Sequence, residues 1–307
     1  MSRIYEVLKK FEMERALTGS AAEAQAAEPL ARQEGLSDEA ALQAAKIISA
    51  GGRSDVSLVS GHERLDELRR RCTRGNWNFD PESMIFCEQS FSPCAEQFRV
   101  LRTRLYRLRQ DWPLRSLLVT STTPNEGKTF VTLNLAQAIA SQHKRYVLII
   151  DADLRCSRLH VPMGAPSSPG LADFLRGDAD EFSIIQTDAH SNLFFIPAGE
   201  PASNPAELLS SMRMRELLDR LGPMFDWVIL DAPPVLPVSD AGVLAGVCDG
   251  VLFVVRAGAT AFDLAQLACQ EFRAKNLVGI VLNQVEERVA AAYGAYSYYG
   301  GNGTDKR

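Results

Sequence analysis

The amino-acid sequence predicts an α/β protein with a doubly wound, mostly parallel sheet. Short apolar runs recur from about residue 116 to residue 282, segments of helical length separate them, and the runs are apolar throughout. Such strands are typical of parallel sheets that helices cover on both faces. The predicted strands are Ser116–Thr120, Tyr146–Ile150, Leu193–Ile196, Trp227–Leu230, Gly250–Val255 and Val278–Leu282. In such a sheet a ligand is expected at the carboxyl ends of the strands.

Length and composition allow one large domain or two small ones with a substantial core. The chain has 307 residues, 46% of them hydrophobic, and its net charge of −5 gives no basic footprint for nucleic acid. The cysteine spacing predicts free thiols rather than a zinc site or a disulfide framework. No apolar run has the length of a membrane span and no signal-peptide pattern opens the chain. We therefore expect a cytoplasmic protein that reaches a membrane only through a partner.

The pattern of the sequence changes twice along the chain. Residues 1–90 are predicted to form a helical, partly disordered and linker-rich extension, residues 91–290 the α/β domain, and residues 291–307 a flexible tail. Within the extension, residues 1–17 have apolar side chains at helical spacing. This helix packs on its own domain or docks on another protein. A second helix is expected at residues 37–52.

A phosphate-binding loop is predicted directly after the first strand. Residues 122–129 read T-x-x-x-x-G-K-T, close to the pattern G-x-x-x-x-G-K-[ST]. Backbone N–H groups of such a loop wrap phosphates, Lys128 would reach the β- and γ-phosphates, and the Thr129 hydroxyl would bind Mg²⁺. The alternative is an ordinary turn that contains Gly-Lys-Thr. The expected nucleotide contacts are Thr123, Pro124, Asn125, Glu126, Gly127, Lys128, Thr129 and Phe130.

Acidic residues stand at the ends of two predicted strands. Asp151 and Asp153 follow one apolar run, and Asp231 follows another. The three carboxylates should lie at the same edge of the sheet as the loop, where their repulsion raises one or more pKa values unless a cation neutralises them. Mg²⁺ carried in with a nucleotide is such a cation, so Thr129, Asp153 and Asp231 form the predicted metal site. Helix capping is the alternative, and it would explain one of the three.

Three motifs together resemble the Walker A, Walker A′ and Walker B motifs of the bacterial tyrosine kinases, or BY-kinases. They are residues 122–129, 147–155 and 228–234, and their D-x-D-x-R and D-x-P-P forms are typical of that family. The family comprises autokinases of capsule and exopolysaccharide synthesis with a P-loop NTPase fold. The likeness runs over about residues 91–299. Residues 1–10 resemble the split type, which is encoded without its own membrane segment.

The resemblance implies roles for individual residues. Asp151 would accept the tyrosine proton; an exchange of roles with Asp153 is an alternative. Asn283, just past a strand end, is expected to contact the adenine of ATP. Cys156 stands where the family often has a second basic residue, so that Arg155 would act alone. The implied catalytic residues are Lys128, Asp151, Asp153 and Arg155.

The tail carries the feature that distinguishes a kinase from other nucleotide-binding proteins. Four of the seven tyrosines lie close together in it: Tyr293, Tyr296, Tyr298 and Tyr299. In BY-kinases such a cluster accepts the phosphate. A sticky aromatic tail that binds a partner is the alternative.

A further signature and the family's partners follow from the same resemblance. Glu96, Arg99 and Arg102 match E-x-x-R-x-x-R, which in the family mediates subunit contact in a ring; a solvated charged face is the alternative. The implied partners are other copies of the chain, a membrane polysaccharide co-polymerase (a chain-length determinant) as activator, and a cognate tyrosine phosphatase. The chain would then lie at the inner membrane through its partner.

Two other functions share these motifs. A ParA- or MinD-like positioning ATPase would normally carry a signature lysine at the place of Thr123 and an amphipathic membrane helix at its C-terminus. A catalytically silent nucleotide-binding partner would not need the retained Lys128 and acids. The sequence favours a Mg-ATP-dependent protein-tyrosine autokinase that phosphorylates its tail in trans and regulates exopolysaccharide biosynthesis or export.

Overall fold

The computed structural model describes residues 64–83, 92–188, 191–272 and 277–286. The chain divides into two compact units, Met1–Ser60 and Gly61–Arg307, and every described residue belongs to the second unit. The helices expected at residues 1–17 and 37–52, and the tail at residues 291–307, lie outside the described residues.

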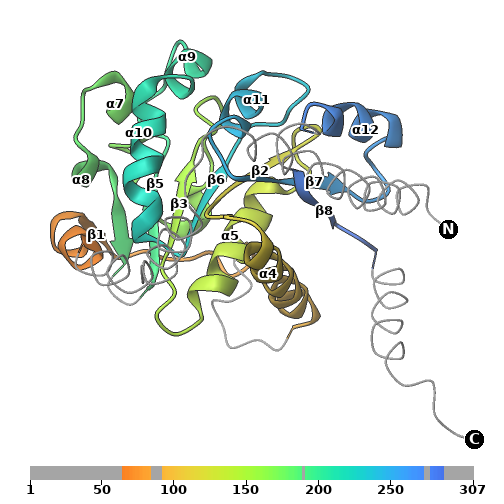
Figure 1. The fold of residues 1–307 in the computed structure, drawn as a ribbon, viewed down its shortest axis with the longest axis horizontal. Coiled ribbons are helices and arrows are strands. Elements are labelled where there is room, and N and C mark those ends of the chain that lie inside the picture. The colour runs from red at the N-terminus through yellow and green to blue at the C-terminus, as the bar shows by residue number, and fades with distance from the viewer. Residues whose placement is uncertain (1–63, 84–91, 189–190, 273–276, 287–307) are drawn as a thin grey trace, which may run out of the picture. The chain divides into compact units, whose positions relative to one another are not determined.

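Strands and helices alternate along the described chain (Figure 1). The strands are β1 (Thr73–Gly75), β2 (Ser116–Ser121), β3 (Val147–Asp151), β4 (Gln186–Asp188), β5 (Leu193–Ile196), β6 (Trp227–Asp231), β7 (Gly250–Arg256) and β8 (Leu277–Asn283). The helices are α4 (Pro93–Asp111), α5 (Lys128–Ala140), α6 (His160–Met163), α7 (Leu171–Arg176), α8 (Glu181–Ile184), α9 (Pro205–Leu209), α10 (Met212–Leu221), the short 3₁₀ turn η1 (Gly222–Met224), α11 (Asp240–Ala245) and α12 (Phe262–Gln270). All the strands predicted from apolar runs are present, with ends within one residue of their predicted bounds.

The strands form one sheet in the order β1-β4-β5-β3-β6-β2-β7-β8. Neighbouring strands are parallel except for β4 and β5, so the predicted doubly wound, mostly parallel sheet is confirmed. The sequence did not predict β1 and β4, because each is three residues long and mostly polar. At the centre β3, β6 and β2 are consecutive, so the segments that follow these strands lie beside one another.

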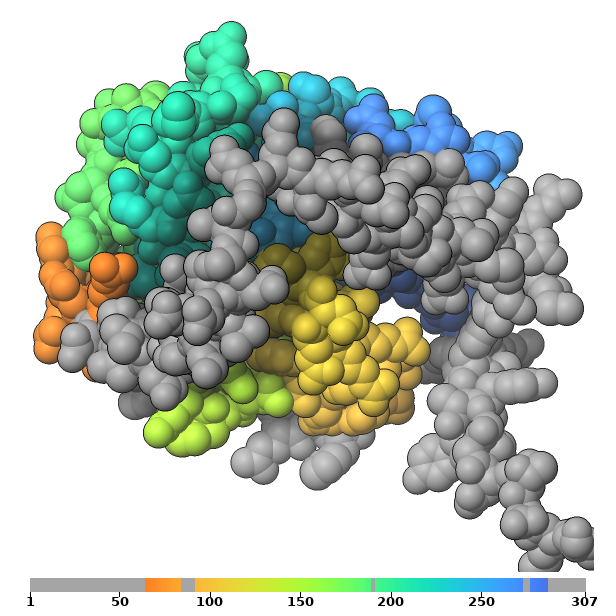
Figure 2. Space-filling model, viewed as in Figure 1, coloured from red at the N-terminus to blue at the C-terminus, as the bar shows by residue number. Residues whose placement is uncertain are grey.

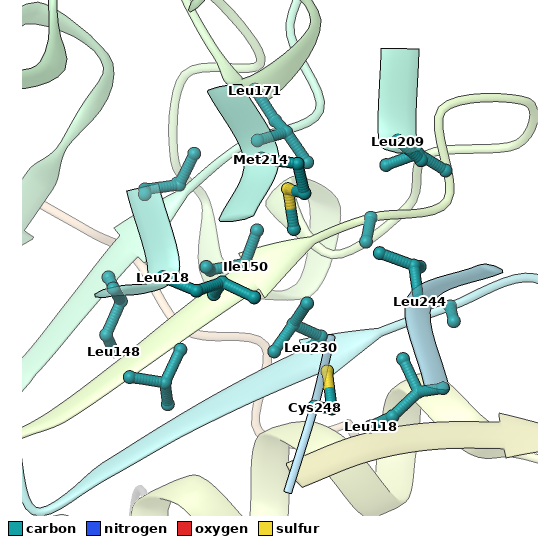
Figure 3. Close-up of a cluster of buried hydrophobic side chains, with 14 of the residues drawn as sticks. Leu118, Leu148, Ile150, Leu171, Leu209, Met214, Leu218, Leu230, Leu244 and Cys248 are labelled. Atoms are coloured by element: carbon teal, nitrogen blue, oxygen red, sulfur yellow. The ribbon is translucent and has the colours of Figure 1, made fainter. Parts of the chain in front are cut away.

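Alternate residues of the central strands enter two separate cores. In β3, Leu148 and Ile150 belong to one cluster and Val147 and Ile149 to the other. The first cluster is closed by α7, α9, α10, α11 and α12, and the second by α4, α5 and α6; Figure 1 shows these two helical layers. In Figure 3, Leu148, Ile150 and Leu230 lie beneath residues of the covering helices. Burying each such leucine or isoleucine contributes about 1.5–3 kcal/mol, so the strands that position the site are held from both faces.

Residues 64–83 contribute to both cores, although their sequence predicts no particular helix or strand. Residues 64–71 are helical, and Leu65 and Leu68 belong to the first cluster. Beyond β1, Trp77 belongs to the second cluster, and the carbonyl of Ser83 accepts a hydrogen bond from Asn134 of α5 at 2.9 Å. This segment therefore passes around the β1 edge of the sheet.

The described cysteines are free thiols, as predicted: Cys72, Cys94, Cys156, Cys248 and Cys269. Among the described helices, none combines the length and the hydropathy that a membrane crossing requires.

Candidate active site

The loop between β2 and α5 has the backbone geometry of an anion-binding turn. Asn125 and Gly127 both adopt left-handed conformations, with φ of 66° and 88°. Gly127 is the N-cap of α5 and no side chain caps this helix end. The N–H groups of the first turn therefore have no intrahelical acceptor. Together with the dipole of a 13-residue helix they favour an anion at this position.

Position 127 also requires glycine for space. A Cβ there would collide with Nδ2 of Asn283, which donates to the carbonyl oxygen of Glu126 at 2.9 Å. Asn283 is the last residue of β8, so this strand end is fastened to the phosphate loop. The contact of Asn283 with adenine stays a prediction, and in this structure its amide holds the loop.

The side chain of Glu126 braces the loop from within. It is 2% exposed and accepts hydrogen bonds from the N–H of Thr123 at 2.9 Å and from the hydroxyl of Thr260. The N–H of Arg256, at the end of β7, lies 3.5 Å from the same carboxylate. Because protein donors occupy the carboxylate and Asn283 occupies the carbonyl oxygen, Glu126 would meet a phosphate through its backbone N–H.

Three buried acids gather around one ammonium group. Nζ of Lys128 lies 3.0 Å from Oδ2 of Asp153 and 3.5 Å from Oδ2 of Asp231. Asp151 is the register partner of Asp231 in the β3–β6 ladder, so these two acids stand on adjacent strands. Asp151, Asp153 and Asp231 are 0%, 3% and 1% exposed. One cation therefore faces three buried carboxyl groups.

Burial and repulsion shift the pKa values in the cluster. Burial, followed by the charge of Asp231, raises the pKa of Asp151 to about 7. Burial also raises the pKa of Asp231, against the stabilising charge of Lys128. Burial alone would lower the pKa of Lys128, but the charges of Asp231 and Asp153 outweigh it and raise this pKa above its usual value. Lys128 stays protonated, whereas Asp151 is poised near neutrality to exchange a proton.

The oxygen atoms around Lys128 are suited to bind a magnesium ion together with the phosphates of a nucleotide. Thr129 Oγ1 donates to Oδ2 of Asp231 at 2.7 Å, and Asp153 lies on the other side of the ammonium group. Mg²⁺ prefers one or two carboxylates together with waters and phosphate oxygens. No three His, Cys, Asp or Glu side chains of the described residues are arranged to hold a metal ion by themselves. Thr129, Asp153 and Asp231 supply oxygen atoms of the kind that bind Mg²⁺ together with a nucleotide.

Asp151 is held in place by donors from the loop that follows β3. Its Oδ2 accepts from the Ser157 hydroxyl at 2.8 Å and from the N–H of Leu159 at 3.2 Å, and its Oδ1 accepts from the N–H of Asp153 at 3.2 Å. No sequence motif identifies Ser157. Its position six residues after a strand-end acid is the only signal that the sequence offers, and it is a weak one.

Arg155 makes a contact that no motif predicts. Its Nε and one Nη donate to the two carboxylate oxygens of Asp240 at 2.8 and 3.0 Å. Asp240 is the first residue of α11 and is fully buried. The two residues are 85 positions apart in the chain, so sequence spacing gives no sign of the pair.

The structure brings together only part of the predicted interface set. Glu96 and Arg99 form an ion pair of 2.9 Å on α4, and the outer side of this helix is part of the visible surface (Figure 2). Arg102 instead donates to the carbonyl oxygen of Ala138 in α5 at 2.6 Å. The predicted acceptors Tyr293, Tyr296, Tyr298 and Tyr299 lie outside the described residues.

A phosphate loop after β2 and buried acids at the ends of β3 and β6 define a nucleotide-binding P-loop domain. The sequence matches the family described as "CobQ/CobB/MinD/ParA nucleotide binding domain" over residues 117–295. Tyrosine-protein kinase YwqD of Bacillus subtilis is 34% identical over 208 residues, which cover 67% of this chain and 86% of YwqD. The chain belongs to the bacterial tyrosine kinase family.

Longer relatives and solved structures support membership in the same family. Tyrosine-protein kinase Etk of Escherichia coli is 36% identical over 65% of this chain, but the match covers only 28% of Etk. The solved kinase domain of Etk superimposes with a TM-score of 0.61 and 36% identity, covering 63% of this chain and 76% of that domain. The chimerical protein CapA2B2 gives a TM-score of 0.63 at 30% identity, covering 67% of this chain and 92% of the chimera.

Proposed function

We propose that this protein is a Mg-ATP-dependent protein-tyrosine autokinase whose acceptors are the tyrosines of its own C-terminal cluster. The observation that carries the proposal is the group of three buried acids and one lysine at the mouth of the phosphate loop. Membership in a family of tyrosine kinases gives this group a reaction: the γ-phosphoryl group of ATP passes to a tyrosine hydroxyl.

The residues of the loop bind and orient the phosphates. The uncapped N-terminus of α5 and the left-handed turn at Asn125–Gly127 supply N–H donors, and Lys128 supplies a positive charge. Thr129, Asp153 and Asp231 would hold the magnesium ion, which neutralises charge that develops on the phosphates during transfer. Catalysis of this kind depends on positioning and electrostatics.

Asp151 is the proposed base, with Asp153 as the alternative. Transfer breaks the bond between the γ-phosphorus and ADP and forms a bond to the phenolic oxygen, whose proton passes to the carboxylate. A phenol with a pKa of about 10 is protonated at neutral pH, so a base with a pKa of about 7 is suited to accept that proton. A positioned base of this kind contributes about 10²–10⁴-fold to the rate.

The proposal also includes the assembly of the kinase and its regulation by partner proteins. Ring formation through Glu96, Arg99 and Arg102 of α4 would present each tail to a neighbouring site, so that phosphorylation occurs in trans. Phosphorylated tyrosines carry about −1.5 to −2 charges each, and their repulsion would loosen the ring. A membrane polysaccharide co-polymerase would activate the kinase at the inner membrane, a cognate phosphatase would reset it, and exopolysaccharide or capsule synthesis would respond.

The test is an incubation of the purified full chain with Mg²⁺ and labelled ATP, followed by mass spectrometry of the tail. We expect phosphotyrosine among Tyr293, Tyr296, Tyr298 and Tyr299, and none in the Lys128→Met variant. The assay is run with and without the cytoplasmic segment of a co-polymerase, because an activator belongs to the proposal. Release of free phosphate without phosphotyrosine in both conditions would instead support a positioning ATPase. Nucleotide binding with neither product would support a silent regulatory partner.

A further inference from the structure

We infer that Arg155 acts on the reaction through Asp240, as a strut that fixes the two acid-bearing loops of the site, and not by touching the nucleotide. This inference rests on the proposed function, because it concerns the placement of the residues that would hold magnesium and phosphate. It also makes Asp240, which no motif identifies, a positioning residue of the site.

The geometry of the pair favours a fixed connection. Arg155 approaches Asp240 with two parallel N–H groups at 2.8 and 3.0 Å, the bidentate arrangement that gives arginine–carboxylate pairs their orientation. The Asp240 side chain is fully buried, whereas that of Arg155 is 40% exposed. The side chain of Asp240 has no other hydrogen-bond partner among the described residues. Moving this edge of the guanidinium to a phosphate would leave a buried carboxylate unpaired, which is strongly unfavourable.

The strut closes a ring of contacts around the site. Arg155 lies two residues after Asp153, which binds Lys128. Asp240 lies at the end of the segment that begins at Asp231. That segment is hydrogen-bonded along the phosphate loop, because the N–H of Val235 donates to the carbonyl of Ser121 at 2.9 Å and the N–H of Leu236 to that of Thr122 at 3.3 Å. Without the strut, the loop that carries Asp153 would lose its side-chain hydrogen bonds to Asp240 of α11.

The fold supplies a matched control at the opposite ends of the same two strands. Arg145 precedes β3 and Asp226 precedes β6, and their ion pair is 2.6 Å long. The exposed fractions of the two arginines are similar, 47% for Arg145 and 40% for Arg155. Each pair thus joins the segments that flank β3 and β6, but only the Arg155–Asp240 pair lies on the side of the phosphate loop.

The experiment is a double-mutant cycle with Arg155→Ala, Asp240→Asn and the double variant, in the full-length protein. A strut predicts that each single change lowers kcat by about tenfold to a hundredfold, because small misplacements in a catalytic site have effects of that size. The double variant should lose no more than the worse single variant. Each change should also raise the Mg²⁺ concentration needed for half-maximal ADP binding. Arg145→Ala should lower Tm and leave kcat and the Mg²⁺ requirement within about twofold of wild type.

Direct contact of Arg155 with the nucleotide predicts a different pattern and would overturn the inference. Asp240→Asn would then leave kcat near the wild-type value, while Arg155→Ala would reduce it, and the double variant would match Arg155→Ala alone. Equal losses in all variants including Arg145→Ala would mean that the pair serves only stability. ADP binding is measured separately from phosphoryl transfer, so the strut is testable even if the wild-type chain forms no phosphotyrosine.

Discussion

Acidic residues have different surroundings at the two ends of the central strands. At the amino ends, Asp226 accepts from Arg145 at 2.6 Å and from the N–H of Tyr146 at 2.9 Å, and Asp249 accepts from the N–H groups of Arg115 and Ser116. Each of these acids ties neighbouring segments together through its hydrogen bonds. At the carboxyl ends, Asp151, Asp153 and Asp231 are buried around a single ammonium group.

Under the proposed function, the difference separates acids that stabilise the fold from acids that bind a ligand. A carboxylate that is paired at the surface costs little, whereas three buried carboxyl groups with one cation carry repulsion and desolvation. A protein tolerates such a cluster where binding a cation repays it. We therefore expect substitutions of acids at the amino ends to change stability, and substitutions of acids at the carboxyl ends to change activity.

The largest expected effect comes from a pair of isosteric changes, one at each end. Asp151→Asn should lower kcat for tail phosphorylation by about a hundredfold or more, because the proposed base is lost. Asp226→Asn should leave kcat within about twofold and lower the free energy of unfolding by about 1–2 kcal/mol, because an ionic hydrogen bond is weakened. Steady-state kinetics and urea denaturation of both variants check this. A large kcat loss in Asp226→Asn would break the comparison.

Asp151, at the carboxyl end of β3, should make the stability of the protein depend on pH. The pKa of Asp151 is about 7 in the folded state and about 3.9 in the unfolded chain. Folded protein therefore holds a proton that the unfolded chain has released, and this contribution to stability is lost as pH rises from about 4 through 7. Between pH 5 and pH 8, wild type should lose roughly 1–3 kcal/mol relative to Asp151→Asn.

The measurement is denaturant unfolding of both proteins at the two pH values, in buffer free of Mg²⁺ and nucleotide. Comparing the two proteins cancels the titration of the acids that do not interact with Asp151. If the free energy of unfolding changed equally with pH in wild type and Asp151→Asn, the pKa of Asp151 would not be raised in the folded state.

Two glycines offer a smaller test of the same contrast. Gly127→Ala should lower the free energy of unfolding by about 1–3 kcal/mol and weaken ADP binding, because φ of Gly127 is +88° and the new Cβ would collide with Asn283. Gly222→Ala, in η1 just before β6, should be neutral within about 0.5 kcal/mol, because nothing lies within 4 Å of its Cβ position. Thermal unfolding with and without ADP separates the two effects. Normal ADP affinity in Gly127→Ala would mean that the loop is not preformed.

The smallest expected effects concern the arginines of α4. Arg102 and Arg109 each donate to a backbone carbonyl at 2.6 Å, that of Ala138 and that of Asp226. Replacing either by Ala should cost about 1–2 kcal/mol in the free energy of unfolding. Arg99→Ala removes an exposed pair with Glu96 and should change this free energy by less than about 1 kcal/mol. If Arg102→Ala alters assembly in analytical ultracentrifugation without any loss of stability, its contact with α5 is not its main role.

The sequence was sufficient for the parts of the fold that have strong local patterns. Continuous apolar runs located β2, β3 and β6, and the acids after them pointed to one edge of the sheet. Strands β1 and β4 were not predicted, because three-residue strands with polar side chains have no periodicity to read. Their place is set by pairing with each other and with β5.

In the candidate site, too, the sequence predicts the residues of the motifs but not the contacts between distant segments. Lys128, Asp153 and Asp231 lie together because strand order places them there, and motif spacing was enough to expect it. The contact between Arg155 and Asp240, and the bond from Thr260 to Glu126, join residues 85 and 134 positions apart. No local pattern encodes such contacts, since they depend on how loops from different strands meet.

The hydrogen bond from Asn283 to the carbonyl of Glu126 sets a limit on where the tail can act. Tyr293 follows Asn283 by ten residues (293 minus 283) and Tyr299 by sixteen (299 minus 283). A fully extended chain gains at most about 3.3–3.6 Å per residue, so the Cα atoms of these tyrosines stay within roughly 35 and 55 Å of Asn283, which is hydrogen-bonded to the phosphate loop. Under the proposed phosphorylation in trans, the active site of the neighbouring copy must therefore lie within about that distance of Asn283.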